Sequence, residues 1–185
     1  MIAIWIVLAV VVVAALWAVS VYNGLVRQKN VVAEGWSGID VQLKRRADLI
    51  PNLTATVQGY AAHERGTFDE LTKLRSQTGT QDVAQRAQTE AAITAAIGKV
   101  MAVAEAYPDL KASANFQQLQ HDLGDIEDQI QMARRYYNGA VRDFNTQIGQ
   151  FPSNVIAGFG GFTPAQFFQI DNAADREVPK VSFGS

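Results

Sequence analysis

The chain contains no cysteine, and histidine occurs only twice among its 185 residues. Without cysteine there is no thiol nucleophile, no disulfide and no attachment point for a lipoprotein anchor. The sequence also lacks GxSxG, HExxH, Glu-x-x-His and Walker patterns, the common signatures of nucleophilic catalysis, metal centres and phosphate binding. Because reducing and oxidising compartments both tolerate a cysteine-free protein, this absence does not place the chain on either side of a membrane.

Charged side chains are absent from Met1 to Val26, and residues 2–21 are almost entirely Ile, Val, Leu, Ala and Trp. A helix needs about 20 such residues to cross ~30 Å of hydrocarbon, so a membrane-spanning helix is predicted. Trp5 and Tyr22 mark its ends, roughly 25 Å apart along a helix, where aromatic rings favour the two interfaces. The alternative is a signal peptide cleaved near Ala18-Val19-Ser20. The missing basic n-region and the length of the apolar run argue against it.

Basic residues are missing before this stretch and present after it, at Arg27, at Lys29 and again at Lys44–Arg46. The positive-inside rule therefore predicts a single-pass protein with the bulk of the chain in the cytoplasm, and a periplasmic or extracytoplasmic location is the alternative. The 16 basic and 18 acidic residues give a net charge of −2. That balance provides no electrostatic footprint for nucleic acid, so no nucleic-acid partner is expected.

Apolar residues recur every three, four or seven positions from Leu25 to Leu74, and this helical pattern keeps its phase through Pro51. Proline inside a helix removes a backbone hydrogen bond and costs about 3 kcal/mol. We therefore expect either one kinked helix or two segments that share a buried face. The first clear break is expected at Thr78-Gly79-Thr80.

Two further helices are predicted, an Ala-rich one from Gln81 to Tyr107 and one from Phe116 to Phe151 with the 3-4 spacing of coiled-coil packing. The segment from Phe151 to Ile170, rich in glycine and phenylalanine, is expected to be irregular and to pack on the helices. The predicted fold is all-α: an N-terminal transmembrane helix that continues into an elongated antiparallel bundle of three to four long helices. The expected organisation is an anchor at residues 1–24, a helical bundle domain at 25–170 and a polar C-terminal tail at 171–185.

Several stretches together resemble the LemA family: WSGID at Trp36–Asp40, LKRRADLIPNL at Leu43–Leu53, YAAHE at Tyr60–Glu64, and ARRYYNGAVRDFN with FPSNVIAGFGGF further on. The resemblance covers nearly the whole chain and is weakest in the helix from Gln81 to Tyr107. It implies a bacterial inner-membrane helical-bundle protein whose biochemical activity is poorly defined. It carries no catalytic residues that transfer to this sequence.

A dense polar cluster lies just before the helical proline. It comprises Lys44, Arg45, Arg46 and Asp48. We interpret it as a structural ion network beside Pro51, in which Arg45 and Asp48 pair across one helical turn. Asn52 is expected to bond to a carbonyl group that the proline leaves free. A surface for a protein partner or for self-association, and a ligand site, are the alternatives.

Asparagines occur in two pairs spaced by one heptad, Asn23 with Asn30 and Asn138 with Asn145, each beside an apolar stripe. A polar side chain beside a helical core can fix the register of packing. We therefore predict an interhelical hydrogen-bond network between the first and last helices. A binding pocket at the same place is the alternative.

One constellation would suit a metal ion. His121, Asp125 and Asp128 fall on one helical face, at positions i, i+4 and i+7. Side chains of this type ligate divalent metals, so a metal-dependent helical enzyme is an alternative reading of the chain. Because the sequence lacks the di-iron and HExxH signatures, we expect no metal, no cofactor and no enzyme activity.

The predicted function is therefore that of a non-enzymatic interaction, scaffold or assembly protein held in the bilayer through residues 1–22. It is expected to bind protein partners or to self-associate, as a possible homo-oligomer. The candidate contact surface is aromatic and comprises Phe159, Phe162, Phe167 and Phe168, which are expected to be exposed. A membrane-linked signalling factor with Gly24 as a hinge is a further alternative.

Overall fold

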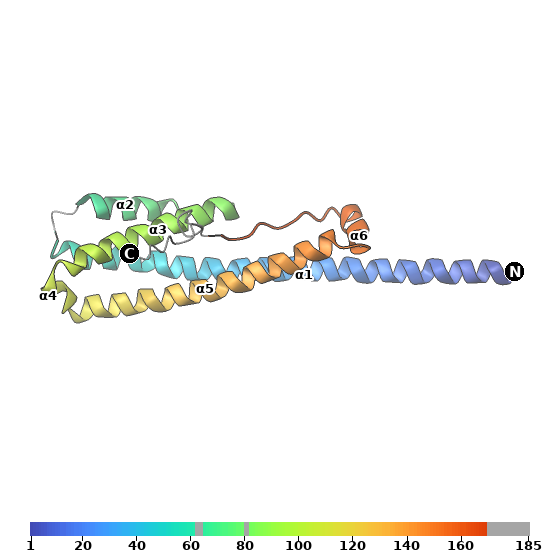
Figure 1. Cartoon of the computed structure of the whole chain (residues 1–185), viewed down its shortest axis with the longest axis horizontal. Helices are drawn as coiled ribbons and strands as arrows, with labels where there is room; N and C mark the ends of the chain where they lie inside the picture. Colours follow the sequence, from blue (N-terminus) through green and yellow to red (C-terminus); the bar gives the residue numbers. More distant parts are fainter. Residues whose placement is uncertain (62–64, 80–81, 170–185) are drawn as a thin grey trace, which may run out of the picture. The chain divides into compact units, whose positions relative to one another are not determined.

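The computed structural model describes residues 1–61, 65–79 and 82–169, and these residues form helices and irregular segments without a strand (Figure 1). The all-α prediction is confirmed. The helices are α1 (Ile2–Gln58), α2 (Arg65–Ser76), α3 (Val83–Glu105), α4 (Pro108–Lys111), α5 (Ala114–Gly149) and α6 (Ser153–Phe159). The polar tail predicted at 171–185 lies outside the described residues.

Contacts group the chain into two compact units. The first unit is Met1–Val41 with Gln131–Phe167, and the second unit is Gln42–Ile130 with the chain from Phe168. Both α1 and α5 contribute to each unit, since these helices run from one set of residues into the other.

Helix α1 is 57 residues long and contains Pro51 without interruption, so of the two predicted alternatives the chain forms one helix and not two segments. Its most apolar 18-residue window has a mean hydropathy of 3.0 and is 0% buried, as expected for a stretch that faces lipid rather than a protein core. Gly24 lies inside this helix. A Cβ there would come within 3.2 Å of the end of the Gln147 side chain, and the helix is unbroken at this glycine, which one alternative reading of the sequence made a hinge.

The first break comes at Gln58, earlier than the predicted one at Thr78-Gly79-Thr80. The amides of Tyr60 and Ala61 both bond to the carbonyl of Val57, which closes the end of α1. The apolar phase resumes in α2, where Phe68 is buried. The prediction from periodicity therefore treated α1 and α2 as one helical stretch, although the chain turns between them.

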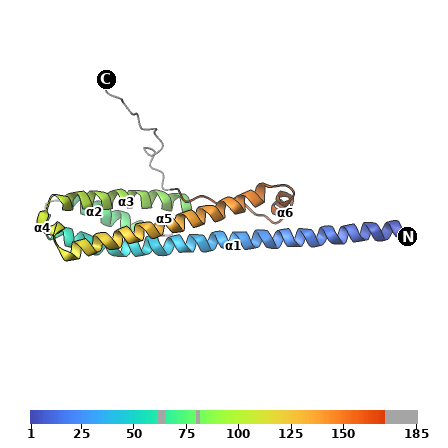
Figure 2. The same cartoon turned by 60° about the horizontal axis from the view of Figure 1, so that its bottom comes forward.

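The core of the second unit is formed by α2, α3, α4 and the adjoining parts of α1 and α5. Helix α2 lies along α3 in both views (Figures 1 and 2). Asp82 caps α3 by accepting a hydrogen bond from the amide of Gln85 at 2.8 Å. The buried cluster comprises Ile50, Leu53, Val57, Ala61, Phe68, Leu71, Ile93, Ala96, Val100, Ala104, Leu110, Phe116 and Leu123.

In the first unit, α1 and α5 run antiparallel and α6 packs against both. Gly35 lets the two long helices approach closely, because a Cβ there would lie 3.1 Å from the Cα of Tyr137. Leu25, Phe144 and Ala157 form the buried centre. Helix α6 corrects the expectation that residues 151–170 are wholly irregular: Ser153–Phe159 are helical, and the irregular segment follows them.

Candidate functional site

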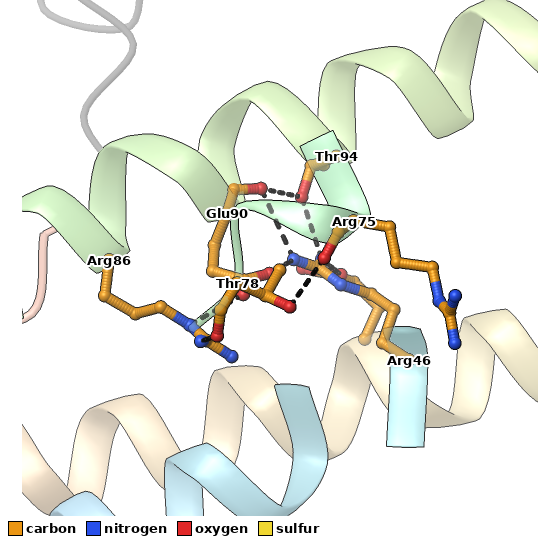
Figure 3. Close-up of polar contacts among 7 residues, drawn as sticks. Arg46, Arg75, Thr78, Arg86, Glu90 and Thr94 are labelled. Carbon is orange, nitrogen blue, oxygen red and sulfur yellow. Dashed lines mark hydrogen bonds and ion pairs between the residues drawn. The ribbon is translucent and has the colours of Figure 1, made fainter. Parts of the chain in front are cut away.

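The described residues contain a buried ion network centred on Arg46, whose side chain is only 2% exposed. Its guanidinium reaches from α1 to α3, where Nη2 donates to Glu90 Oε2 at 2.6 Å and Nη1 to Thr94 Oγ1 at 2.8 Å (Figure 3). Nη1 also donates to Glu127 Oε2 on α5 at 2.8 Å. Arg46 therefore ties three helices of the second unit together.

A second arginine shares the same carboxylate. Arg86 Nε lies 2.8 Å from Glu90 Oε1, one helical turn away on α3, and Arg86 Nη1 donates to the carbonyl of Thr78 (Figure 3). Glu90 is 1% exposed, and each of its oxygens faces one guanidinium. Glu127 supplies a second carboxylate to Arg46, so each of the two buried arginines has a carboxylate partner. The pairing matters because an unpaired charge in a protein interior costs several kcal/mol.

The predicted polar cluster divides in the structure. Arg46 enters the core, whereas Lys44, Arg45 and Asp48 are exposed. Arg45 donates to Gln42 at 3.3 Å, and the predicted pair with Asp48 does not form among the described residues. The network therefore lies on the predicted segment and uses one residue of the predicted cluster, Arg46, with Glu90 and Glu127 of other helices as its partners.

Pro51 leaves the carbonyl of Ala47, four residues earlier, without its helical donor. Arg75 of α2 takes that role, since its Nε donates to the Ala47 oxygen at 2.9 Å. Asn52, which was expected to satisfy a freed carbonyl, is exposed, and its side chain forms no hydrogen bond within the described residues. The proline is therefore accommodated by a neighbouring helix and not by the adjacent side chain.

Among the described residues, Asn23, Asn30 and Asn145 form no side-chain hydrogen bond between the first and last helices. Asn23 and Asn30 are exposed, and Asn138 is half-buried. Asn145 instead exchanges two hydrogen bonds with the backbone of Ala165, donating to its carbonyl at 2.9 Å and accepting from its amide at 2.8 Å. The pairing fastens the segment after α6 to α5.

Tyr137 fastens the same segment at a second point. Its hydroxyl donates to the carbonyl of Gln166 at 2.7 Å, and its ring packs 5.6 Å from that of Trp36. Burial raises the pKa of Tyr137 above its ordinary value of 10.0. The phenol therefore stays neutral, and able to donate its hydrogen bond, to a higher pH than a tyrosine in water.

The predicted aromatic surface is only partly exposed. Phe159 is 89% and Phe167 41% exposed, whereas Phe168 is fully buried. Phe162 is half-buried, with its ring 5.5 Å from Tyr22 and 6.3 Å from Phe144. The expectation of four exposed phenylalanines is therefore wrong for Phe162 and Phe168, because these two rings fill core positions.

The candidate metal ligands lie on the surface of α5. His121 Nε2 and Asp125 Oδ2 are 3.4 Å apart, with side chains 68% and 66% exposed, and Asp128 is also exposed. Among the described residues, no group of three or more His, Cys, Asp or Glu side chains is arranged to hold a metal ion. The pair is an exposed helical contact of one turn.

The sequence is similar to a known protein family. The model of the LemA family matches residues 35–183. The chain belongs to the LemA family. It is 31% identical to Protein LemA of Metamycoplasma hominis over 73% of this chain and 63% of that protein. It is 26% identical to magnetosome protein MamQ 2 of Paramagnetospirillum magneticum over 85% of this chain and 68% of that protein.

In this LemA-family chain, the family match includes every residue of the ion network and the helical proline, and begins after the apolar stretch of α1. Reasoning from sequence missed Glu90, Arg86 and Arg75. One signal was available for the first two, because Arg86 and Glu90 stand one turn apart in an otherwise Ala-rich apolar helix. For Arg75, whose partner is a backbone oxygen, the sequence carries no such signal.

Proposed function

We propose that this chain is a single-pass protein of a bacterial inner membrane whose helical region acts as a non-enzymatic interaction or scaffold module. The observation that carries the proposal is the continuity of α1. One helix, Ile2–Gln58, includes the exposed uncharged stretch and core residues such as Leu43 and Leu53. A helix built this way links a lipid-facing segment covalently and without a loop to the folded region.

The chemistry of the buried charges supports an interaction role over a catalytic one. Catalytic groups sit in clefts where a substrate reaches them. Glu90 and Arg46 are 1% and 2% exposed and are bonded to each other, so they hold helices together and offer no surface to a substrate. The relatives named magnetosome protein MamQ are also named for a cellular structure and not for a reaction.

The proposed orientation places the helical region in the cytoplasm, because Arg27 and Lys29 directly follow the apolar stretch. The absence of cysteine makes this simple to test. We expect a cysteine introduced at exposed Lys111 to react with a membrane-impermeant maleimide in inverted vesicles and not in intact spheroplasts. Labelling in spheroplasts alone would place the helical region outside the cytoplasm.

The interaction role is tested by cross-linking the tagged full-length chain in intact cells before purification. A scaffold or self-associating protein should give discrete higher-mass species with constant stoichiometry as the cross-linker concentration rises. An unrelated single-pass protein expressed at the same level is the control for random collisions. If the chain stays monomeric at every concentration, the interaction role is wrong.

A further inference from the structure

Parts of the two longest uncharged stretches of the sequence come together in the first unit. One runs from Met1 to Val26, and the other from Phe144 to Ile170. Ala157 of α6 packs with Leu25 of α1, and both views show α6 beside α1 (Figures 1 and 2). Two sequence segments that lack charge for their full length therefore share one packing site.

This packing site lies where a spanning helix would leave the hydrocarbon. The ring of Phe162 meets Tyr22, and a Cβ on Gly160 would come within 3.2 Å of the Tyr22 ring. Tyrosine favours the interface between membrane and water, and the first charge, Arg27, follows within about two helical turns. The contacts of α6 with α1 thus fall at the expected membrane boundary.

The side of α6 that faces away from α1 is apolar and uncovered. Val155 and Phe159 are 47% and 89% exposed, whereas Ala157, on the other side of the helix, is 1% exposed. Phe151, just before α6, is 77% exposed. Exposed large apolar groups that gather in one place mark an interaction site.

We infer that α6 docks into the interfacial layer of the bilayer that residues 2–22 cross, with Phe151, Val155 and Phe159 inserted among the lipid headgroups and upper acyl chains. The inference rests on the proposed membrane anchoring. Lipid is favoured as the occupant because α6 and the residues just after it meet α1 at Tyr22, next to the lipid-facing part of α1, through Gly160 and Phe162. The complete absence of charge from this segment also suits the membrane boundary better than a polar protein rim.

A matched position for comparison exists in the same unit. Tyr136 of α5 is also aromatic and 54% exposed, but its ring lies against Gly35 of α1. Gly35 follows Tyr22 by a distance of roughly 20 Å along the helix. Tyr136 therefore provides an exposed aromatic site beyond the reach of an interfacial lipid layer.

Single cysteines labelled with an environment-sensitive dye test the inference in the full-length chain. We would use Phe159→Cys, Tyr136→Cys and Val12→Cys in phosphatidylcholine and phosphatidylglycerol vesicles that contain lipids with a shallow or a deep doxyl quencher. An interfacial helix lies roughly 5–10 Å into the boundary, so the shallow quencher should lower the Phe159→Cys signal about twofold and the deep quencher less. The Val12→Cys label should respond most to the deep quencher, and the Tyr136→Cys label to neither.

Each other outcome has a defined meaning. If Val12→Cys is quenched while Phe159→Cys is unquenched and open to aqueous iodide, the docking of α6 is wrong and the anchoring stands. If Val12→Cys is unquenched, the anchoring itself fails. If Phe159→Cys is shielded from iodide and from both lipid quenchers, protein covers α6, which overturns lipid as the occupant.

A further variant shows whether the helix or the dye itself is responsible for insertion into the bilayer. Adding Val155→Asp to Phe159→Cys places a carboxylate on the inserted side, so quenching by the shallow lipid should fall to the level of Tyr136→Cys. Unchanged quenching would mean that the dye enters the bilayer by itself, and the inference would then fail.

Discussion

In the second unit, charged side chains meet inside the core, whereas the described core of the first unit is held by aromatic rings and neutral hydrogen bonds. The charged core of the second unit is represented by Arg46 and Glu90, which are almost fully buried and whose Nη2 and Oε2 atoms lie 2.6 Å apart. The neutral hydrogen bonds of the first unit are represented by Asn145 and Tyr137, since each side chain bonds to a backbone group of the segment after α6. The same two long helices thus use different chemistry in their two parts.

The difference teaches how each part responds to change. A buried ion pair contributes little net stability, but the loss of one partner leaves the other charge stranded in a low-dielectric interior. Apolar and neutral contacts are lost one at a time, with a cost that depends on the cavity left behind. The stability of the second unit should therefore fall most when a buried charge is removed, and that of the first unit when a buried side chain is shortened.

The largest effect is expected from Glu90→Gln. This change keeps the size of the side chain but removes the carboxylate that faces both Arg46 and Arg86. Leaving the arginines buried without it should lower the free energy of unfolding by about 3–5 kcal/mol. Urea unfolding of the full-length chain in detergent micelles, followed by far-ultraviolet circular dichroism, measures the loss.

The control is the same substitution in an exposed pair. Glu70 lies 2.9 Å from Lys99, with side chains 46% and 57% exposed. Exposed ion pairs are worth less than about 1 kcal/mol, so Glu70→Gln should change the unfolding free energy only slightly. Equal losses from the two variants would show that burial does not distinguish the ion network.

The first unit should respond more to a cavity. Leu25 is fully buried between Phe144 and Ala157, and Leu25→Ala should cost about 2–5 kcal/mol. Leu16 on the same helix is 66% exposed, so Leu16→Ala creates no cavity in the protein and should leave the unfolding free energy nearly unchanged. With Trp5 and Trp17 replaced by Phe in every variant, the fluorescence of Trp36 reports on this unit during unfolding. A large loss from Leu16→Ala would contradict the assignment of its side chain to lipid.

Hydrophobic periodicity predicted the core well and the helix ends less well. Ile50, Leu53 and Ile130 are buried as the pattern required. The end of α1 at Gln58 escaped prediction because the apolar phase carries on in α2, so the turn leaves no gap in the pattern. Helix α6 escaped because a seven-residue helix among glycines gives no periodic signal.

The ion network shows a different limit. Arg46 belonged to the predicted polar cluster, but its partner Glu90 lies 44 residues away in sequence. Which carboxylate it meets depends on how α1, α3 and α5 pack, and no local spacing encodes that choice. The bond from Arg75 to the Ala47 carbonyl is harder still, because a backbone oxygen leaves no mark in the sequence.

A smaller effect is expected from the contact that accommodates Pro51. Arg75→Gln removes the donor to the Ala47 carbonyl and should cost about 0.5–1.5 kcal/mol. In a Pro51→Ala background, the new amide donates to that carbonyl within the helix. Arg75→Gln should then cost measurably less, and the double-mutant cycle gives the coupling. Equal losses in both backgrounds would show that the arginine does not compensate for the proline.

The smallest effect concerns Tyr137, whose hydroxyl donates to Gln166. Tyr137→Phe removes one neutral hydrogen bond and should cost about 1 kcal/mol at neutral pH. Because burial raises the pKa of Tyr137 above 10.0, the unfolded chain loses this proton before the folded chain does. The stability from the neutral phenol is complete below about pH 10 and is lost as the pH rises through the raised value. Unfolding curves between pH 8 and 11 measure both effects.

Tyr136→Phe is the matched control, since its side chain is 54% exposed. Part of the alkaline loss of stability should disappear in Tyr137→Phe and persist in Tyr136→Phe, because burial raises the pKa of Tyr137 and that phenol is absent only from the first variant. If both variants keep the full alkaline loss, the neutral hydrogen bond to Gln166 does not contribute to holding the segment after α6. The first unit would then depend on its apolar packing alone, which would sharpen the contrast with the charged core of the second unit.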